Sequence, residues 1–506
     1  MRRKKAILTF VTSIFLQIIL MITNFILPHF IILNYGSEIN GLINSITKFL
    51  SYISLFEAGI GGVITALLYK PLAKKDNDDL SVIVVSTLNF FRKISFILII
   101  YVIALCILYP LLIEKSFDNW YIILLIIIIA LNNFASYFFG LINQLLLKAD
   151  QKGYVVNICQ SIMILISTII MIYLIVNKQS IHIVKIFGTL IMMIPPIFYY
   201  LYVKKNYIIN WNVLPSKKVI SKRWDGFSHQ LAAFVHTNTD IAILTIFSSL
   251  NEVSVYAVYS MVTSGLKSII TTLTTSISAA FGSLYAKGEI DKLVKQFEIF
   301  NYFNIIIIYF VFSIAGLLIT PFVKIYVGGA NDANYVRELF GVLLILSEAV
   351  YLLRCIYSTI ISVVGHYRET KIHAYIECLL NLLLSIVLIK PFGLVGIAIG
   401  TLCGMLIRLV LSFVYVDRKI INYNKKEALK IYFVNTIAVI VFLFISLKIY
   451  NFNSISNISS WIVAGILNSI LLLFIMFVFN YVFLKKNLKE VYNEYFKKIF
   501  KLLRKN

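Results

Sequence analysis

The chain has 506 residues, of which 60% are hydrophobic and 14% are charged, and its formal net charge is +23. A soluble protein of this composition could not bury its apolar side chains, so the soluble globular class is excluded. A strongly basic balance can indicate nucleic-acid binding. Here the lysines and arginines are spread between apolar stretches, so we expect no nucleic-acid partner.

Fourteen apolar stretches follow one another through nearly the whole chain. A helix needs about 20 apolar residues to cross the hydrocarbon core of a bilayer. The pattern therefore predicts an all-α, polytopic protein with about 14 transmembrane helices and membrane lipids around it. The predicted spans are residues 6–34, 40–69, 82–113, 119–147, 153–177, 181–203, 224–248, 252–285, 296–322, 335–364, 370–389, 392–416, 428–449 and 459–484.

Lysine and arginine gather on alternate connections between these stretches, beginning with Arg2 to Lys5 and ending with the tail after Lys485. Cytoplasmic loops of membrane proteins carry such an excess of basic residues. We therefore predict a multi-pass protein of a bacterial cytoplasmic membrane, with both termini in the cytoplasm.

Two pairs of segments resemble each other at a similar offset along the chain. Residues 38–76 resemble residues 252–291, and the residues before the fifth span resemble those before the eleventh. Either the similarity is chance between apolar helices, or the chain holds two parallel six-helix repeats related by pseudo-two-fold symmetry, with substrate bound between them near the midplane.

The repeat predicts a domain organisation. The expected parts are an N-terminal six-helix bundle (1–205), a cytoplasmic linker (206–223), a C-terminal six-helix bundle (224–418), two further helices (419–484) and a basic tail (485–506). The tail is either an amphipathic helix on the inner leaflet or disordered.

Charged side chains near the middle of a span cost roughly 2.5–3.5 kcal/mol on insertion scales, so they usually face a bundle interior or a hydrated cavity. Cations in such a cavity would suit an anionic substrate, because arginine can bind phosphate through two parallel hydrogen bonds. Alternatively, each cation pairs with a carboxylate and braces the bundle. The candidate residues are the cations Arg354, Lys267, Lys48 and Arg408, the carboxylates Asp240, Glu57, Glu348 and Glu377, and the histidines His236 and His229.

The seventh span carries His229, His236 and Asp240 at spacings of seven and four, which place them on one helix face. This stripe could carry protons or bind a cation. It could equally be a polar face that meets water, without proton movement.

Enzyme motifs are missing from the sequence. It has no P-loop and no HExxH, and no external loop exceeds about 15 residues. We expect neither an enzyme nor a cofactor or metal site, and the five cysteines fall inside predicted spans, where they serve as small packing residues.

Three segments resemble the polysaccharide repeat-unit flippases, the Wzx-type branch of the MOP superfamily, which also holds the MATE exporters. LLKADQKGYV is similar to the junction after the fourth helix, and HTNTDIAILTIFSSLNEVSVYAVYSM is similar to the seventh and eighth helices, with Asp240 in its usual place. GHYRETKIHAYIECLLNLLLSIVLIKPFGLVGIAIGTLCG is similar to the eleventh and twelfth, where Gly393, Gly396 and Gly400 match recurring glycines.

The resemblance implies a flippase that moves an undecaprenyl-pyrophosphate-linked oligosaccharide from the inner to the outer leaflet by alternating access. Its product would enter capsule, O-antigen or wall polysaccharide assembly, with a polymerase and glycosyltransferases as partners. The cavity cations would bind the pyrophosphate, and proton or sodium coupling through the acidic and histidine residues is an option. The competing hypotheses are a MATE-like, cation-coupled exporter of small molecules and a non-transporting scaffold.

Overall fold

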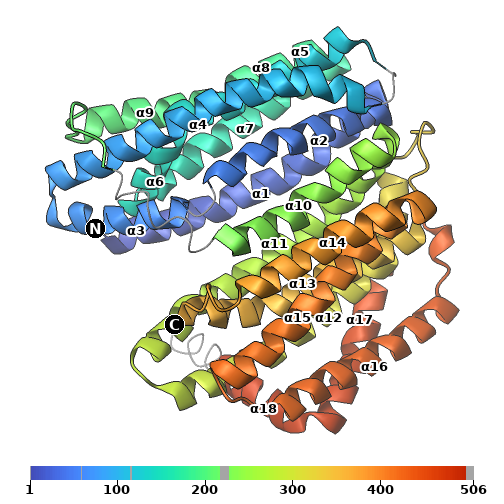
Figure 1. Cartoon of the computed structure of the whole chain (residues 1–506). Helices are drawn as coiled ribbons and strands as arrows, with labels where there is room; N and C mark the ends of the chain where they lie inside the picture. Colours follow the sequence, from blue (N-terminus) through green and yellow to red (C-terminus); the bar gives the residue numbers. More distant parts are fainter. Residues whose placement is uncertain (1, 58–59, 114–116, 217–226, 497–506) are drawn as a thin grey trace. The chain divides into compact units, whose positions relative to one another are not determined.

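The computed structural model describes residues 2–57, 60–113, 117–216 and 227–496. Throughout these ranges the ordered elements are helices, and none of them is a strand (Figure 1). The prediction of an all-α fold is confirmed.

The chain forms two compact units, residues 1–257 with 329–333, and residues 258–328 with 334–506. Helix α11 (Leu250–Ala286) begins in unit 1 and continues into unit 2. The other elements of unit 1 are α1 (Arg2–Tyr35), α2 (Ser37–Ser51), η1 (Tyr52–Glu57), α3 (Ile60–Lys74), α4 (Asn77–Leu112), α5 (Asn119–Ala135), η2 (Ser136–Gly140), α6 (Leu141–Ala149), α7 (Gly153–Val176), α8 (Ile181–Met192), α9 (Ile194–Asn206) and α10 (Phe227–Phe247). Those of unit 2 are α12 (Ile290–Tyr326), α13 (Glu338–Val364), α14 (Lys371–Phe392), α15 (Leu394–Lys419), α16 (Lys425–Ile449), η5 (Phe452–Ser454), α17 (Ile458–Phe483), α18 (Lys485–Val491) and η6 (Tyr492–Phe496).

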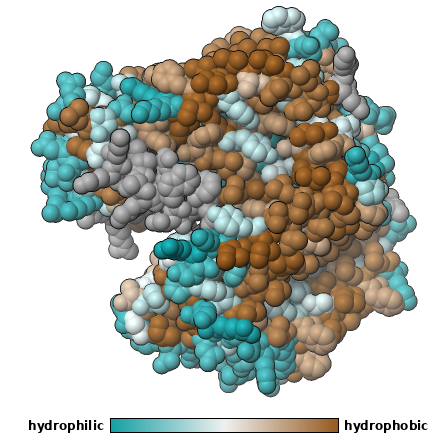
Figure 2. Space-filling model, viewed as in Figure 1, coloured by the Kyte–Doolittle hydropathy of each residue, from teal (hydrophilic) through white to brown (hydrophobic). Residues whose placement is uncertain are grey.

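The described helices are those of a multi-pass membrane protein. Twelve of them are long and apolar enough to cross a bilayer, or thirteen if α2–η1 and α3, which meet at a bend of 47°, form one span. Helix α10 forms where the seventh span is predicted but is not among these candidates. Large apolar side chains face outward, such as Ile470 and Phe474 of α17, and hydrophobic residues cover much of the face seen in Figure 2. Lipid, rather than water, suits such a surface.

Helix α2 packs closely on α10 and on the first turns of α11 within unit 1. A Cβ on Gly41 would come within 1.8 Å of the Leu250 carbonyl oxygen. The Ser45 hydroxyl lies 2.6 Å from that of Thr245 and accepts a 2.7 Å hydrogen bond from Tyr109. Glycine and hydroxyl residues thus let these helices approach closely. Such small residues are common where helices pack against each other within a membrane.

The segment Gly329–Ala333 belongs to unit 1, although both helices that it joins, α12 and α13, belong to unit 2. Asp332 in this segment accepts hydrogen bonds from the backbone N–H of Ser37 at 2.6 Å and from its hydroxyl at 2.7 Å. Because Ser37 begins α2, the carboxylate caps one free N–H group at a helix N-terminus, where negative charge is also favoured.

Glycines in residues 365–404, the segment that resembles the eleventh and twelfth helices of the flippases, bring α14 and α15 together in unit 2. A Cβ on Gly396 would lie 2.2 Å from the Leu388 carbonyl oxygen, and one on Gly400 would lie 2.4 Å from the Ser385 hydroxyl. Gly393, between the two helices, has a φ of +55°, a conformation that other residues avoid. Close packing and a tight turn therefore explain these three glycines physically.

Helices α16 and α17 pack on α12, so the predicted thirteenth and fourteenth spans belong to unit 2. Tyr302 donates a 3.0 Å hydrogen bond to the Asn480 side chain, which donates one of 3.0 Å to Asn435. All three side chains are buried. Hydrogen bonds between membrane helices of this kind hold them together where the hydrophobic effect cannot.

The predicted bundle boundaries stay a prediction. Helix α10, placed by the sequence in the bundle 224–418, packs on α2 in unit 1. Part of the predicted linker, residues 217–223, and the end of the predicted tail, residues 497–506, lie outside the described residues. The described part of the tail, through Phe496, is helical.

Candidate functional site

A cluster of charged side chains lies inside unit 2, around the ring of Tyr351. Four helices contribute to it: α11 brings Lys267, α13 brings Glu348 and Arg354, and α14 and α15 bring one residue each. The Lys267 ammonium lies 4.1 Å from the centre of the Tyr351 ring, and the Arg354 guanidinium lies 4.9 Å from it. Both distances are typical of cations held by an aromatic face.

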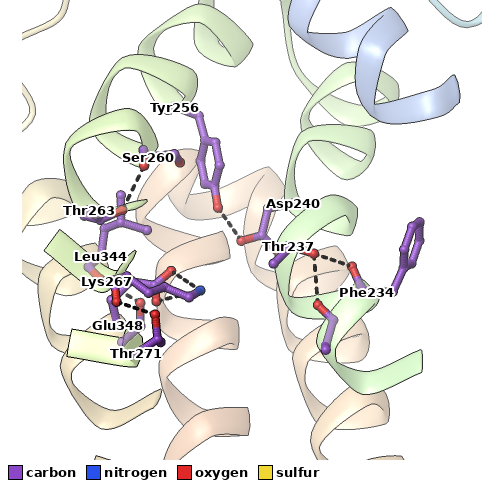
Figure 3. Close-up of polar contacts among 12 residues, drawn as sticks. Phe234, Thr237, Asp240, Tyr256, Ser260, Thr263, Lys267, Thr271, Leu344 and Glu348 are labelled. Atoms are coloured by element: carbon purple, nitrogen blue, oxygen red, sulfur yellow. Dashed lines mark hydrogen bonds and ion pairs between the residues drawn. The ribbon is translucent and has the colours of Figure 1, made fainter. Parts of the chain in front are cut away.

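Lys267 pairs with Glu348 across α11 and α13. The Lys267 Nζ lies 3.0 Å from Glu348 Oε2. Figure 3 shows the two side chains next to each other. Both side chains are largely buried, with 16% and 11% of their surfaces exposed. Lys267 therefore has the carboxylate partner that the bracing alternative requires, and its role in binding substrate stays a prediction.

Arg408 of α15 pairs with Glu377 of α14 through a hydrogen-bonded ion pair. Both residues are buried. Because the glycines of α15 bring these helices into close contact, the pair is held between two tightly packed backbones. Arg408, too, has a carboxylate partner.

Arg354 differs from the other two cations of the cluster. It is 6% exposed, and among the described residues no carboxylate lies within 4.0 Å of it. Its Nη1 donates a 2.8 Å hydrogen bond to Ser358, whereas its Nε is buried and has no hydrogen-bond partner in the described chain. The carboxylate that acts on it at longer range, Glu377, is already the ion-pair partner of Arg408. A buried charge without a direct partner is costly, so this guanidinium is suited to bind an anion.

The cluster holds three cations and two carboxylates, which leaves a net positive charge inside unit 2. Within the described chain, Arg354 presents an unused donor, its Nε. Lys267 and Arg408 would contact a further anion only if they shared it with their present carboxylate partners or released those carboxylates. The chemistry that this arrangement supports is binding of an anionic group beside Tyr351.

Lys48 lies in unit 1 and has different neighbours. Its ammonium donates hydrogen bonds to the Thr237 carbonyl oxygen at 3.0 Å and to the Asn238 side chain at 3.3 Å. Ser51 of the same helix also donates to Asn238, at 3.1 Å. These contacts tie α2 to α10, and a phosphate-binding role for Lys48 stays a prediction.

Four of the six acidic and histidine residues predicted for coupling or for a polar cavity lie in unit 1. Asp240 is buried and accepts a 2.7 Å hydrogen bond from Tyr256 (Figure 3). His236 is also buried on the same continuous helix, α10, and His229 is half-buried. Glu57, at the end of η1, is hydrogen-bonded to Tyr137. Proton or cation movement through these groups stays a prediction.

Three residues of interest are missed by the sequence reasoning. Tyr351 lies three residues from both Glu348 and Arg354, so helical spacing could have placed it on the charged face. Arg92 lies within α4, 4.9 Å from the Phe138 ring, and its buried Nε has no hydrogen-bond partner among the described residues. Lys185 lies in α8. Both cations fall within predicted spans, so their charge alone could have flagged them.

No protein-family model matches the sequence, and no curated protein is similar to it in sequence. Solved structures are similar in fold. The lipid II flippase MurJ in an inward closed conformation is 16% identical, with a TM-score of 0.70 over 95% of this chain and 99% of that chain. An inward-facing multidrug resistance MATE family transporter of the MOP superfamily is 15% identical, with a TM-score of 0.62 over 81% of this chain and 97% of that chain.

A MOP superfamily transporter from Pyrococcus furiosus, reported for the reverse polarity of its binding pocket, is 12% identical, with a TM-score of 0.54 over 81% of this chain and 92% of that chain. The chain therefore has a fold like that of these MOP-superfamily proteins, and the three structures named here are of a flippase and of transporters. Membership of the Wzx-type branch stays a prediction.

Proposed function

We propose that this protein is a flippase that moves an undecaprenyl-pyrophosphate-linked oligosaccharide from the inner to the outer leaflet of a bacterial cytoplasmic membrane by alternating access. The observation that carries the proposal is the buried Arg354, which has no carboxylate within 4.0 Å among the described residues. A pyrophosphate would supply an anion in direct contact with this guanidinium, and arginine matches phosphate geometry through paired donors.

The fold supports a lipid-linked substrate. The similarity to a lipid II flippase extends over 95% of this chain, whereas that to a MATE transporter extends over 81%. A substrate of this class has a polar, anionic head that needs charged partners and a lipid tail that can stay in the bilayer. We infer that the product serves polysaccharide assembly outside the cell, with a polymerase and glycosyltransferases as functional partners.

The membrane potential can drive this transport without nucleotide hydrolysis. With the cell interior negative, outward movement of each net negative charge gains about 2.3 kcal/mol per 100 mV. Exchange against a proton or a sodium ion, carried by Asp240 or by the carboxylates of the cluster, could supply more.

The direct test is transport of a fluorescent undecaprenyl-pyrophosphate oligosaccharide in proteoliposomes. The measured quantity is the fraction of the fluorescence that a membrane-impermeant quencher in the outside solution removes over time. We expect the Arg354→Gln variant to lower the rate by about 10- to 100-fold, because a hydrogen bond to a charged group contributes roughly 1.5–3 kcal/mol. Arg368→Gln is the matched control, since Arg368 is exposed. Equal rates for the wild type and Arg354→Gln would refute the role of Arg354.

The second candidate function is a MATE-like exporter of organic cations. Its supporting observation is that three carboxylates, Asp240, Glu348 and Glu377, are buried within helices, where they could bind cationic substrates or coupling ions. Efflux of a fluorescent organic cation from the same proteoliposomes under a proton or sodium gradient separates the two. Efflux without movement of the lipid-linked oligosaccharide would favour the exporter.

A further inference from the structure

A groove in unit 2 is lined mainly by residues of α12, α13 and α16, and α12 packs against both of the other helices. Its volume is about 960 Å³, which is at the upper end of the range for ligand pockets. On α12 the lining runs from Ile308 to Lys324, a distance of about 24 Å at 1.5 Å per residue. The groove is therefore longer than one leaflet of the hydrocarbon core, which is about 15 Å deep.

The walls of the groove are mainly aliphatic, with residues such as Leu317, Val342, Leu346 and Ile440. Two of the hydroxyl groups in the lining, those of Tyr309 and Thr436, lie 3.0 Å apart and form a hydrogen bond with each other. A groove of this length and polarity, formed by helices that span a membrane, fits an extended acyl chain.

Three charged residues line one end of the groove. Lys324 lies in the last turn of α12 and Lys448 in the last turn of α16, while Glu338 lies in the first turn of α13. All three side chains are exposed. The lysines outnumber the carboxylate, so this end favours a negative group, and the basic-loop pattern assigns it to the outer leaflet.

The groove and the charged cluster use different faces of α13. Ala349 and Leu353 line the groove, whereas Glu348, Tyr351 and Arg354 are not among the described residues that line it. The groove is therefore a separate site on the back of the helix that carries Arg354.

We propose that the groove binds an anionic phospholipid of the outer leaflet, with one acyl chain along α12 and the phosphate headgroup between Lys324 and Lys448. An acyl chain gains little by leaving the bilayer for the groove, because both surroundings are equally apolar. Selection among lipids must therefore come from the charged end. Each lysine near a membrane surface favours an anionic lipid by about fivefold in affinity.

The test is binding of tail-labelled fluorescent phosphatidylglycerol and phosphatidylcholine to the full-length protein in neutral detergent. We expect phosphatidylglycerol to bind about fivefold more tightly. Lys324→Gln and Lys448→Gln should each lower its affinity about fivefold and leave phosphatidylcholine binding unchanged. Glu338→Gln should change the affinity for phosphatidylglycerol in the opposite direction, which a folding defect would not do.

Two further variants test the acyl-chain part. Ala349→Trp places a large side chain in the groove and should weaken binding of both lipids, whereas Leu379→Trp, on the exposed side of α14, should weaken neither. Lys390→Gln is the matched charge control, because Lys390 is exposed and lies outside the groove lining.

Equal affinity of the wild type for the two lipids would overturn the proposal, as would an effect of Lys390→Gln as large as that of Lys324→Gln. Displacement of phosphatidylglycerol by undecaprenyl phosphate at a much lower concentration would also overturn it, since the groove would then belong to the carrier lipid. None of these outcomes depends on whether the protein moves an oligosaccharide.

Discussion

Glu377 and Arg408 illustrate what a buried ion pair does at the scale of single residues. Both lie between α14 and α15, away from solvent. Burial of such a pair costs nearly as much free energy as the attraction returns, so its net stabilising effect is small. Loss of one partner is different, because the other charge then stays buried without its counter-ion.

We therefore expect Glu377→Gln to lower the free energy of unfolding by about 3 kcal/mol, and the double variant Glu377→Leu/Arg408→Met to recover most of that loss. Thermal unfolding of the purified protein in one detergent measures both. A double variant as unstable as the single one would contradict the prediction.

The matched control is the pair of Glu289 and Lys292 at a helix start, whose atoms lie 2.9 Å apart. The hydrogen bond from Lys292 lowers the pKa of the Glu289 carboxyl. Because both side chains are exposed to solvent, Lys292→Gln should leave the unfolding temperature nearly unchanged.

At the scale of elements, close helix packing depends on glycines at particular places. The contact of Gly41 with the Leu250 carbonyl leaves no room for a side chain, whereas nothing lies within 4 Å of a Cβ built on Gly62. The same substitution should therefore have opposite effects at the two positions.

Gly41→Ala should push α2 away from α11 and lower the unfolding temperature. Gly62→Ala, in α3, should raise it, because alanine in an exposed helix is favoured over glycine by about 1 kcal/mol. Thermal unfolding of the two variants side by side is the measurement. A stabilising Gly41→Ala would show that this contact is not close in the folded protein.

At the scale of the whole molecule, the basic loops predict which side of the membrane each connection occupies. In a variant without the five native cysteines, a cysteine at Asn451, between α16 and α17, should react with a membrane-impermeant maleimide in intact cells. A cysteine at Lys486, in α18, should react only after permeabilisation. Both positions are exposed. Labelling of Lys486→Cys from outside would reverse the predicted orientation.

The sequence by itself determined the membrane class and the helical fold, because apolar runs longer than 20 residues have few other stable structures. It also identified Arg354, Lys267, Glu348, Arg408 and Glu377 as candidates, since charge within an apolar run is visible without a structure.

Only the tertiary structure decided which of these charges meet. Lys267 pairs with Glu348, 81 residues away in the sequence, and Arg408 pairs with Glu377, 31 residues away. Arg354 has no carboxylate within 4.0 Å among the described residues. Likewise, Asp332 caps α2 from 295 residues away. The physical reason is that the partner of a charged side chain depends on which helix faces pack together. An apolar run predicts that a helix forms, but it does not show which neighbouring helix its polar side chains will contact.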